Sequence, residues 1–250
     1  MKTLTTTLTL LLLLPLGTVQ ATLRREACDT ITCAPPSAAH ILVSRASTEP
    51  QGTGVLGLIA EGIAAACPGS NIVANPYPAL LSPYVESETE GLNNLTQMAL
   101  SYSSCCPPAT SGRMVFLGYS QGAQVTADFL CGRSEFGFPE TDGYAAVVAD
   151  DVAAVVLMGD PSFVKDLPWD RGDASNESYF PRLNNEGCLP VADKMISYCD
   201  AGDYFCDDGT SADALSIHEE YVWKYGVEVV ANDEIVAHTD LDNCHGNETK

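Results

Sequence analysis

One serine in this chain lies in a setting that could make it a nucleophile. Ser120 is the centre of Gly-Tyr-Ser-Gln-Gly at 118–122, which follows the apolar run 114–117 and precedes a helix-compatible run. A serine lifted out of a tight strand-to-helix turn needs small residues two positions before and after it, which Gly118 and Gly122 provide. The first N–H groups of the following helix could stabilise an oxyanion. The pattern predicts a nucleophilic serine, and a glycine-rich turn without chemistry is the alternative.

A serine nucleophile needs a base, and elimination leaves one histidine of the four. His40 immediately precedes an apolar run and is expected to begin a buried strand. His238 and His245 lie in a polar C-terminal segment, where solvated positions are expected. His218 stands just before the helix-like segment 219–225, so we expect a loop to hold it at the end of an element. In the α/β-hydrolase arrangement the acid and then the histidine follow the serine. His218 fits that order, with a merely exposed histidine as the alternative.

Asp203 is the preferred candidate for the acid because two cysteines enclose it. It lies between Cys199 and Cys206, directly after the strand-like segment 195–198. A disulfide across so short a loop would fix the carboxylate at a strand end and stabilise the fold by about 2–3 kcal/mol on the chain-entropy model. The carboxylate would orient the imidazole and stabilise its charged form. Asp200 is the nearest rival, and a structural staple with an incidental acid is the alternative.

Together these residues resemble the cutinase and acetylxylan esterase family of small secreted serine esterases. The matching segments are Arg-Ala-Ser-Thr-Glu at 45–49, Gly-Tyr-Ser-Gln-Gly-Ala-Gln at 118–124, Met-Gly-Asp-Pro at 158–161, Cys-x-x-Gly-Asp-x-x-Cys at 199–206 and His-x-x-Tyr at 218–221. The resemblance implies that Ser120 is the nucleophile, Asp203 the acid and His218 the base. It also implies that the hydroxyl and N–H of Ser47 and the backbone N–H of Gln121 form the oxyanion hole.

The family pattern further implies a disulfide between Cys33 and Cys106, ahead of the first strand and of the strand that carries the serine. Ten cysteines in a chain directed out of the cell favour disulfides over a metal site, since no Cys and His spacing resembles a zinc ribbon or finger. By remainder, the other pairs would be Cys67 with Cys105, Cys131 with Cys188, and Cys28 with Cys244. We expect no metal and no cofactor.

Two departures from the family bear on the substrate. Many relatives carry proline directly after the acid, whereas this chain has Tyr204. The loop Tyr204 to Ile217 is longer than in cutin-degrading relatives and carries Asp207, Asp208 and Asp213 in place of mainly aliphatic residues. A buried methylene stabilises binding by about 0.8 kcal/mol only where apolar surface receives it. We therefore expect a preference for short acyl esters over waxy chains.

The first 21 residues have the composition of a secretory signal peptide. Lys2 precedes an apolar segment at 8–16, and Val-Gln-Ala at 19–21 provides a cleavage site. The apolar segment is too short to span a membrane, and no later run of 18 apolar residues exists. Beyond residues 1–21 we expect an N-terminal extension at 22–32, a cutinase-like α/β esterase domain at 33–231 and a polar tail at 232–250. The protein is expected to be secreted and extracellular.

The charge of the chain narrows its partners. Its 33 acidic residues against 12 basic ones give a formal net charge of −21, which repels nucleic acid and anionic membranes. A neutral or weakly charged ester in a plant cell-wall polymer is the expected substrate, and we expect a monomer. Solubility in an acidic exterior also explains such a charge. Three sequons, at Asn94, Asn176 and Asn247, are acceptors if the host glycosylates.

Strand-like and helix-like segments alternate along the chain. The expected strands are 39–44, 70–74, 113–117, 153–158 and 194–198, and the expected helices are 54–66, 92–102, a segment from 121, and 219–231. The alternation predicts a mostly parallel sheet with helices on both faces. With the resemblance, it predicts a single α/β-hydrolase-like domain, a three-layer sandwich with no large lid. Pro161 to Pro190 is expected to be an irregular surface loop.

Two classes of function remain open. The first is a secreted serine carboxylic-ester hydrolase that acts through an acyl-enzyme and deacetylates xylan or another short-chain plant cell-wall ester. Hydrolysis of cutin polyester is the alternative within this class. The second class is a non-catalytic secreted wall-binding protein on the same scaffold. The presence of all three triad residues and the oxyanion serine argues against it, since a binder has no reason to hold them together.

Overall fold

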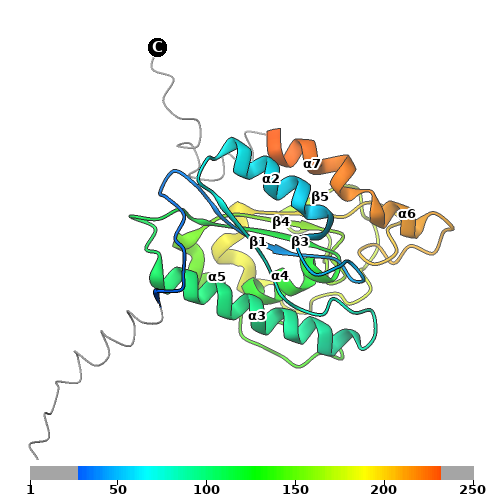
Figure 1. The fold of residues 1–250 in the computed structure, drawn as a ribbon. Coiled ribbons are helices and arrows are strands. Elements are labelled where there is room, and N and C mark those ends of the chain that lie inside the picture. Colours follow the sequence, from blue (N-terminus) through cyan, green and yellow to red (C-terminus); the bar gives the residue numbers. More distant parts are fainter. Residues whose placement is uncertain (1–27, 232–250) are drawn as a thin grey trace, which may run out of the picture. The chain divides into compact units, whose positions relative to one another are not determined.

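The computed structural model describes residues 28–231 of the chain. It divides into two units, Met1–Thr32 and Cys33–Lys250, and the second unit carries the sheet and the helices (Figure 1). In the first unit, the described residues 28–32 make one turn, in which the N–H of Ile31 donates to the carbonyl of Cys28 (3.0 Å). The expected signal peptide and polar tail lie outside the described residues, and with them His238, Cys244, His245 and Asn247.

Six strands form one sheet in the order β2-β1-β3-β4-β6-β5, and all neighbours pair in parallel. The strands are β1 (His40–Ser44), β2 (Asn71–Ala74), β3 (Met114–Tyr119), β4 (Val152–Met158), β5 (Asp170–Arg171) and β6 (Met195–Tyr198). The four inner strands are buried along their whole length, so they read as continuous apolar runs rather than alternating ones. The order reverses between β1 and β3, and a parallel sheet forms its binding crevice at the carboxyl ends beside such a reversal.

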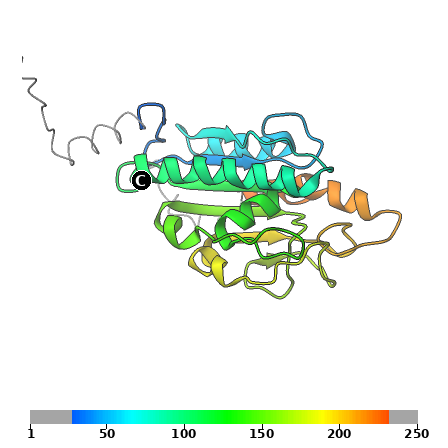
Figure 2. The same ribbon diagram turned by 90° about the horizontal axis from the view of Figure 1, so that it is seen from below.

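Helices cover both faces of the sheet (Figures 1 and 2). They are η1 (Gly54–Leu56), α2 (Gly57–Ala66), α3 (Tyr84–Cys105), α4 (Gln121–Cys131), α5 (Ala145–Val148), η2 (Ala149–Asp151), η3 (Glu186–Lys194), α6 (Ala214–Glu219) and α7 (Tyr221–Ala231). Helices α2 and α7 lie on one face, and α3 and α4 on the other. The predicted three-layer α/β architecture is confirmed.

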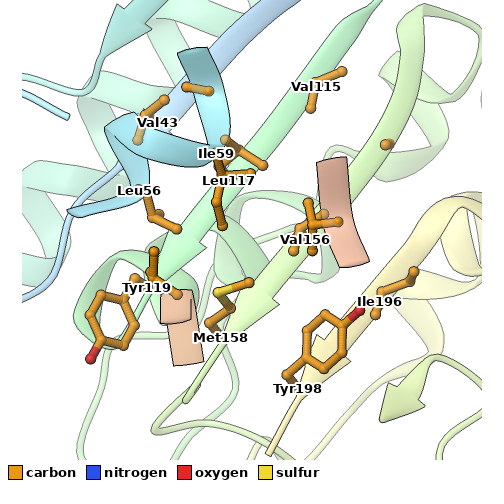
Figure 3. Packing of buried hydrophobic residues seen from close by; sticks show 14 of the residues in the cluster. Val43, Leu56, Ile59, Val115, Leu117, Tyr119, Val156, Met158, Ile196 and Tyr198 are labelled. Carbon is orange, nitrogen blue, oxygen red and sulfur yellow. The ribbon is translucent and has the colours of Figure 1, made fainter. Parts of the chain in front are cut away.

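The main apolar core lies between the sheet and α2. In Figure 3, Val43, Leu117 and Val156 from three adjacent strands gather beside Ile59 of α2. On the opposite face, Phe116 packs against Phe129 of α4 with ring centroids 5.6 Å apart. Since β3 contributes buried side chains to both faces, the strand before Ser120 is anchored on both sides.

Helix α3 begins at Tyr84, well before the expected start at Leu92. Its first turns are polar in sequence, which hid them from a reading based on apolar spacing. Glu88 is nevertheless buried there, because its carboxylate pairs with the guanidinium of Arg133 at 2.5 Å. When the partner of a buried charge is far away in the sequence, the neighbouring residues do not indicate that the charge is buried.

The segment Pro161 to Pro190 is irregular over most of its length, as expected, but parts of it are buried rather than on the surface. It contains β5 and the start of η3, and it buries Phe163 and Arg182. Arg182 reaches into the protein and pairs with Asp128 of α4. The polar composition of this segment was misleading because part of it is an internal ionic network.

Three disulfide pairings are defined within residues 28–231. They are Cys33–Cys106, Cys131–Cys188 and Cys199–Cys206. Cys28, Cys67 and Cys105 are also disulfide-bonded, and the partners proposed for them from the sequence remain predictions. Among the described residues, no helix is both long enough and apolar enough to cross a membrane.

Candidate active site

Ser120 occupies the turn between β3 and α4 in a strained backbone conformation, with φ 55° and ψ −124°. A Cβ atom on Gly118 would lie 2.7 Å from the Cα of Ala123, and one on Gly122 would lie 2.0 Å from the carbonyl oxygen of Ser44. Neither position accepts a side chain without backbone movement. The close packing of both glycines holds the serine in a conformation that an isolated chain would avoid.

Three side chains from distant segments form a hydrogen-bonded chain at the carboxyl ends of the strands. Ser120 Oγ lies 2.8 Å from His218 Nε2, and His218 Nδ1 lies 2.8 Å from Asp203 Oδ2. All three side chains are buried. With its proton on Nδ1, a neutral imidazole donates to the carboxylate and accepts from the serine hydroxyl. That arrangement is the one a general base requires.

The disulfide loop fixes the carboxylate of Asp203. Its Oδ1 accepts the backbone N–H groups of Phe205 (2.7 Å) and Cys206 (2.8 Å), which leaves Oδ2 for His218. The Cys199–Cys206 disulfide closes the same loop directly after β6. The aspartate is therefore held at the strand end by the backbone of its own loop.

Asp200, the rival acid, faces helix α7 instead. Its Oδ2 accepts a hydrogen bond from Lys224 Nζ (2.7 Å), and its Oδ1 accepts one from the hydroxyl of Tyr225 (2.5 Å). The hydrogen bond to Asp200 raises the pKa of Lys224. The structure thus brings Asp203, and not Asp200, to the imidazole.

His218 lies within the short helix α6, and not in the loop that we expected. A helix of six residues is too short to show an apolar period, which explains the wrong expectation. Phe205 holds the imidazole ring edge-on at 4.7 Å, and the hydroxyl of Tyr119 donates to the carbonyl of His218 at 2.5 Å. A Cβ atom on Gly159 would lie 2.8 Å from His218 Cε1. Sequence reasoning did not connect these three residues with His218, because their contact with it is tertiary.

His40 has a structural role. It begins β1, stacks on Tyr102 with ring centroids 3.8 Å apart, and places Nδ1 2.5 Å from Asn71 Oδ1. Burial lowers its pKa, although the hydrogen bond to Asn71 opposes that shift. His40 therefore belongs to the far end of the strand, away from the carboxyl ends that carry the triad.

Two hydrogen-bond donors are available for an oxyanion. Ser47 Oγ is buried and has no hydrogen-bond partner among the described residues, a costly state for a hydroxyl unless a ligand uses it. Gln121 is the first residue of α4, so its backbone N–H has no acceptor within the helix. The side chain of Gln121 is engaged elsewhere, donating to the carbonyl of Leu80 (2.9 Å) and accepting from Ser87 Oγ (3.0 Å). Only its backbone remains for a ligand at the turn.

The loop that carries Ser47 is rigid. The buried guanidinium of Arg45 donates to the carbonyls of Glu49 (2.9 Å) and Tyr77 (2.7 Å). The carboxylate of Glu49 in turn accepts the N–H of Ala46 at 2.7 Å. A donor on such a loop needs little reorganisation when charge develops, which is the property that makes oxyanion stabilisation effective.

Asp207 does not face the mouth of the site, which corrects our expectation for the acidic loop. Its side chain is only 1% exposed. The carboxylate accepts three backbone N–H groups at 2.5–2.7 Å, those of Ser175, Asn176 and Gly202. Burial opposes ionisation of Asp207, but these hydrogen bonds outweigh burial and lower its pKa. Of the three loop aspartates, only Asp208 and Asp213 are exposed to solvent.

A second group of buried acids lies around α4, and we call it the α4 acid cluster. It consists of Glu88, Asp128, Glu135 and Asp160 together with Arg133 and Arg182. Arg182 pairs with both Asp128 and Glu135, and Arg133 pairs with Glu88. The four carboxyl groups and the two guanidinium groups are all buried. Burial accordingly raises the pKa of Asp128, Glu88 and Asp160, with the arginines opposing the shift.

Two of the three predicted glycosylation sites, Asn94 and Asn176, lie within the residues that the structure describes. Asn94 Nδ2 donates to the carbonyl of Pro76 (3.0 Å), and Asn176 Nδ2 donates to Asp207 Oδ2 (3.2 Å). Glycosylation of Asn94, Asn176 and Asn247 remains a prediction. Within residues 28–231, no group of three or more His, Cys, Asp or Glu side chains is arranged to hold a metal ion.

Comparisons with known proteins agree with this architecture. Residues 35–232 match the family model described as Cutinase. The chain is 30% identical over 204 residues to "Acetylxylan esterase" of Hypocrea jecorina, which covers 78% of this chain and 65% of that protein, just under two thirds. It is 30% identical over 208 residues to "Acetylxylan esterase 2" of Talaromyces purpureogenus, covering 78% of this chain and 84% of that one.

The solved structure of the catalytic core domain of acetyl xylan esterase from Trichoderma reesei superposes with a TM-score of 0.72. The two sequences are 29% identical, and the match covers 83% of this chain and 100% of that chain. The family match at residues 35–232 includes Ser120, Asp203 and His218. This chain belongs to the cutinase family.

Proposed function

We propose that this protein is a secreted serine carboxylic-ester hydrolase that removes acetyl or other short acyl groups from a plant cell-wall polysaccharide, with xylan as the first substrate. One observation carries the proposal: Ser120, His218 and Asp203 form an unbroken hydrogen-bonded chain at a strained turn. A strained serine that is hydrogen-bonded to an oriented imidazole is the arrangement of an activated nucleophile.

The geometry supports a two-step mechanism. Ser120 Oγ attacks the carbonyl carbon of the ester while His218 Nε2 takes the hydroxyl proton, and Asp203 stabilises the imidazolium that results. Ser47 Oγ and the N–H of Gln121 donate to the oxyanion of the tetrahedral intermediate. The imidazolium then protonates the departing alcohol, which leaves the acyl group on Ser120. A water molecule, deprotonated by His218, attacks the acyl-enzyme and releases the carboxylic acid.

Short acyl groups follow from the residues at the proposed mouth. Phe205 packs on the imidazole, and the exposed part of the following loop carries Asp208 and Asp213. These residues offer little aliphatic surface to a long chain, and without such surface each added methylene contributes little to binding. The names of the two relatives in the comparison point to the same substrate class.

Cutin hydrolysis is the second candidate, and one observation favours it. Leu80 and Leu81 are 44% and 54% exposed, and the carbonyl of Leu80 accepts the side-chain amide of Gln121, next to the nucleophile. Two exposed leucines at this place could receive an alkyl chain. The length preference for the acyl group therefore decides between the two polymers.

The decisive experiment compares p-nitrophenyl esters from acetate to octanoate and then measures acetate release from acetylated xylan. We expect kcat/KM to fall steadily beyond butyrate, with acetate released from xylan and slow or absent cutin hydrolysis. A profile that rises to octanoate together with rapid cutin depolymerisation would assign the protein as a cutinase. Ser120→Ala is the control, with an expected loss in kcat on the order of 10⁶ and an unchanged fold. Turnover above about a tenth of wild type in this variant contradicts the nucleophile assignment.

Secretion is part of the same proposal. The disulfides Cys33–Cys106, Cys131–Cys188 and Cys199–Cys206 are typical of proteins that fold in an oxidising compartment. Sequencing the N-terminus of the protein from a culture supernatant tests cleavage after Ala21, and light scattering tests the expected monomer.

A further inference from the structure

Two exposed tyrosines stand next to the triad, and the proposed mechanism does not use them. Tyr179 is 51% exposed and Tyr204 is 40% exposed. Their ring centroids are 6.4 Å apart and their planes differ by only 20°. Tyr204 directly follows Asp203, and Phe205 lies between it and the imidazole, at 4.8 Å from the Tyr204 ring and 4.7 Å from the His218 ring. The pair is therefore one aromatic ring away from the proposed base.

The backbone beneath the pair is fixed. The N–H of Tyr179 donates to the carbonyl of Phe205 at 2.7 Å, so the two tyrosine segments are joined directly. The N–H of Phe205 is held by Asp203 Oδ1, and the disulfide at Cys206 closes the loop. Both rings are thus presented to solvent by a rigid support, which is the construction of a preformed binding site.

The far end of the pair is supported as well. Phe180 packs edge-on against Tyr179 at 4.8 Å, and its N–H donates to the carbonyl of Pro161 at 2.8 Å. Phe180 also contacts the ring of Tyr84, which is anchored by a hydrogen bond from its hydroxyl to Gln124 Oε1 (2.8 Å). The side chains around the pair are fixed, while Tyr179 and Tyr204 themselves remain exposed to solvent.

The exposed rings and hydroxyl groups of the two tyrosines suit a carbohydrate ligand. A pyranose ring has a face of C–H groups that packs on the electron-rich face of an aromatic ring, and polar hydroxyls around its edge. Neither tyrosine hydroxyl has a hydrogen-bond partner among the described residues, so both are available to sugar hydroxyls. A neutral sugar chain is also not repelled by a protein of formal net charge −21. Two rings in nearly parallel planes suit successive units of an extended chain better than a single acyl group.

We propose that Tyr179 and Tyr204 form a stacking subsite that binds main-chain pyranose rings of xylan and so presents the acylated unit to Ser120. This proposal rests on the proposed function, because it assumes that the ester is carried by a polysaccharide. It assigns polymer recognition to the tyrosine pair and acyl recognition to the residues around Ser120.

The test separates binding from turnover. In a Ser120→Ala background, Tyr179→Ala and Tyr204→Ala are compared by affinity electrophoresis in gels containing deacetylated xylan. Each variant is expected to weaken retardation by about threefold to tenfold, the range for loss of one aromatic contact. Tyr179→Phe and Tyr204→Phe should keep most of the binding, since the ring face is retained. Trp223→Ala is the matched control, because Trp223 is an exposed aromatic residue on α7 (69%) with no ring contact to the pair among the described residues.

The same substitutions in the active enzyme provide the second readout. The KM for acetylated xylan should rise by the same factor, with kcat/KM for p-nitrophenyl acetate within about twofold of wild type. A variant that carries both Tyr179→Ala and Tyr204→Ala is also tested. If its retardation in the xylan gel equals that of the parent protein, the proposed subsite is wrong. Equal losses on polymer and small ester also overturn it, since the pair would then act on the triad. A dominant loss on p-nitrophenyl octanoate would instead assign the pair to the acyl chain.

The outcomes for subsite and function are distinguishable. If the wild type hydrolyses p-nitrophenyl acetate but releases no acetate from xylan, the proposed substrate fails, while the electrophoresis still reports directly on sugar binding. If acetate release persists in the double alanine variant with an unchanged KM, the proposed function stands and the subsite fails. Circular dichroism melts of each variant confirm that the exposed rings are not needed for folding.

Discussion

Two regions of this protein bury carboxylates in opposite ways. In the disulfide loop 199–206 and the residue after it, Asp203 and Asp207 accept backbone N–H groups at 2.5–2.8 Å. In the α4 acid cluster, Glu88 and Asp128 face arginines and other carboxyl groups. The pKa of Asp207 is lowered, whereas the pKa values of Glu88 and Asp128 are raised. For Asp207 the backbone N–H groups outweigh the effect of burial on its pKa, whereas for Glu88 and Asp128 burial outweighs the effect of the arginines.

The largest effect is expected when the proposed catalytic acid of the first region is replaced. Asp203→Asn removes the charge that orients His218 and favours the wrong tautomer, so kcat should fall by a factor on the order of 10⁴. Asp200→Asn is the matched control, because it changes an aspartate of the same loop that faces Lys224, and it should keep most of the activity. Steady-state kinetics on p-nitrophenyl acetate measure both. The opposite pattern would reverse the assignment of the acid.

The next largest effect is a loss of stability when an arginine of the α4 acid cluster is removed. Arg182→Met leaves Asp128 and Glu135 without their shared cation and should lower the free energy of unfolding by about 3–5 kcal/mol in urea titrations at neutral pH. Lys224→Met is the control, because Lys224 is half exposed and its pair with Asp200 should contribute no more than about 1 kcal/mol. The loss from Arg182→Met should shrink in acid, where the carboxyl groups become neutral. Equal losses from the two variants would show that burial does not matter to these pairs.

A smaller loss of stability is expected when the backbone N–H groups around Asp207 lose their carboxylate acceptor. Asp207→Asn weakens hydrogen bonds to three N–H groups and should cost about 1–3 kcal/mol of stability. Asp208→Asn changes the adjacent, exposed aspartate and should stay within about 0.5 kcal/mol. Thermal unfolding of the two variants measures the difference. If both behave alike, the carboxylate of Asp207 does not organise the loop.

The smallest effect is a pH dependence with opposite signs in the two regions. Asp207 has a lowered pKa, so its stabilisation is present above the unfolded-state pKa and is lost as pH falls through the folded-state pKa. Glu88 and Asp128 have raised pKa values, so their stabilisation is complete below the unfolded-state pKa and is lost as pH rises through the folded-state values. Burial also raises the pKa of Asp170 to about 7, which places part of this loss near neutrality.

The Tm should therefore peak in mild acid and decline through neutral pH. Asp128→Asn should flatten the alkaline side of the curve and Asp207→Asn the acid side. Differential scanning calorimetry between pH 3 and pH 9, in steps of about one unit, checks both limbs. A Tm that climbs steadily from mild acid to pH 8 is incompatible with protons held in the α4 acid cluster.

The same contrast explains what the sequence could predict. Strands such as 153–158 were located to within a residue because a strand buried on both faces is an uninterrupted apolar run. The relation of Ser120 to its two glycines was also readable, since the steric requirement is local. The partners of Glu88 and Arg182 were not readable, because each pair joins residues that are far apart in the chain. The direction of Asp207 was missed for the same reason, since two of its three donors come from residues 175 and 176.

The near contact at Gly122 has a consequence for how such an enzyme can change. Because the carbonyl of Ser44 occupies the space of a side chain at Gly122, the start of α4 is seated against the end of β1. Ser44 leads directly into the loop of Ser47, so this main-chain contact and the hydrogen bonds of Arg45 and Glu49 within the loop together set the spacing of the two proposed oxyanion donors. Side chains at the rim, such as Tyr204 and Leu80, can therefore vary during divergence without altering the spacing of the donors. Substitutions at the rim can therefore change which esters are accepted, while the residues that carry out ester hydrolysis stay the same.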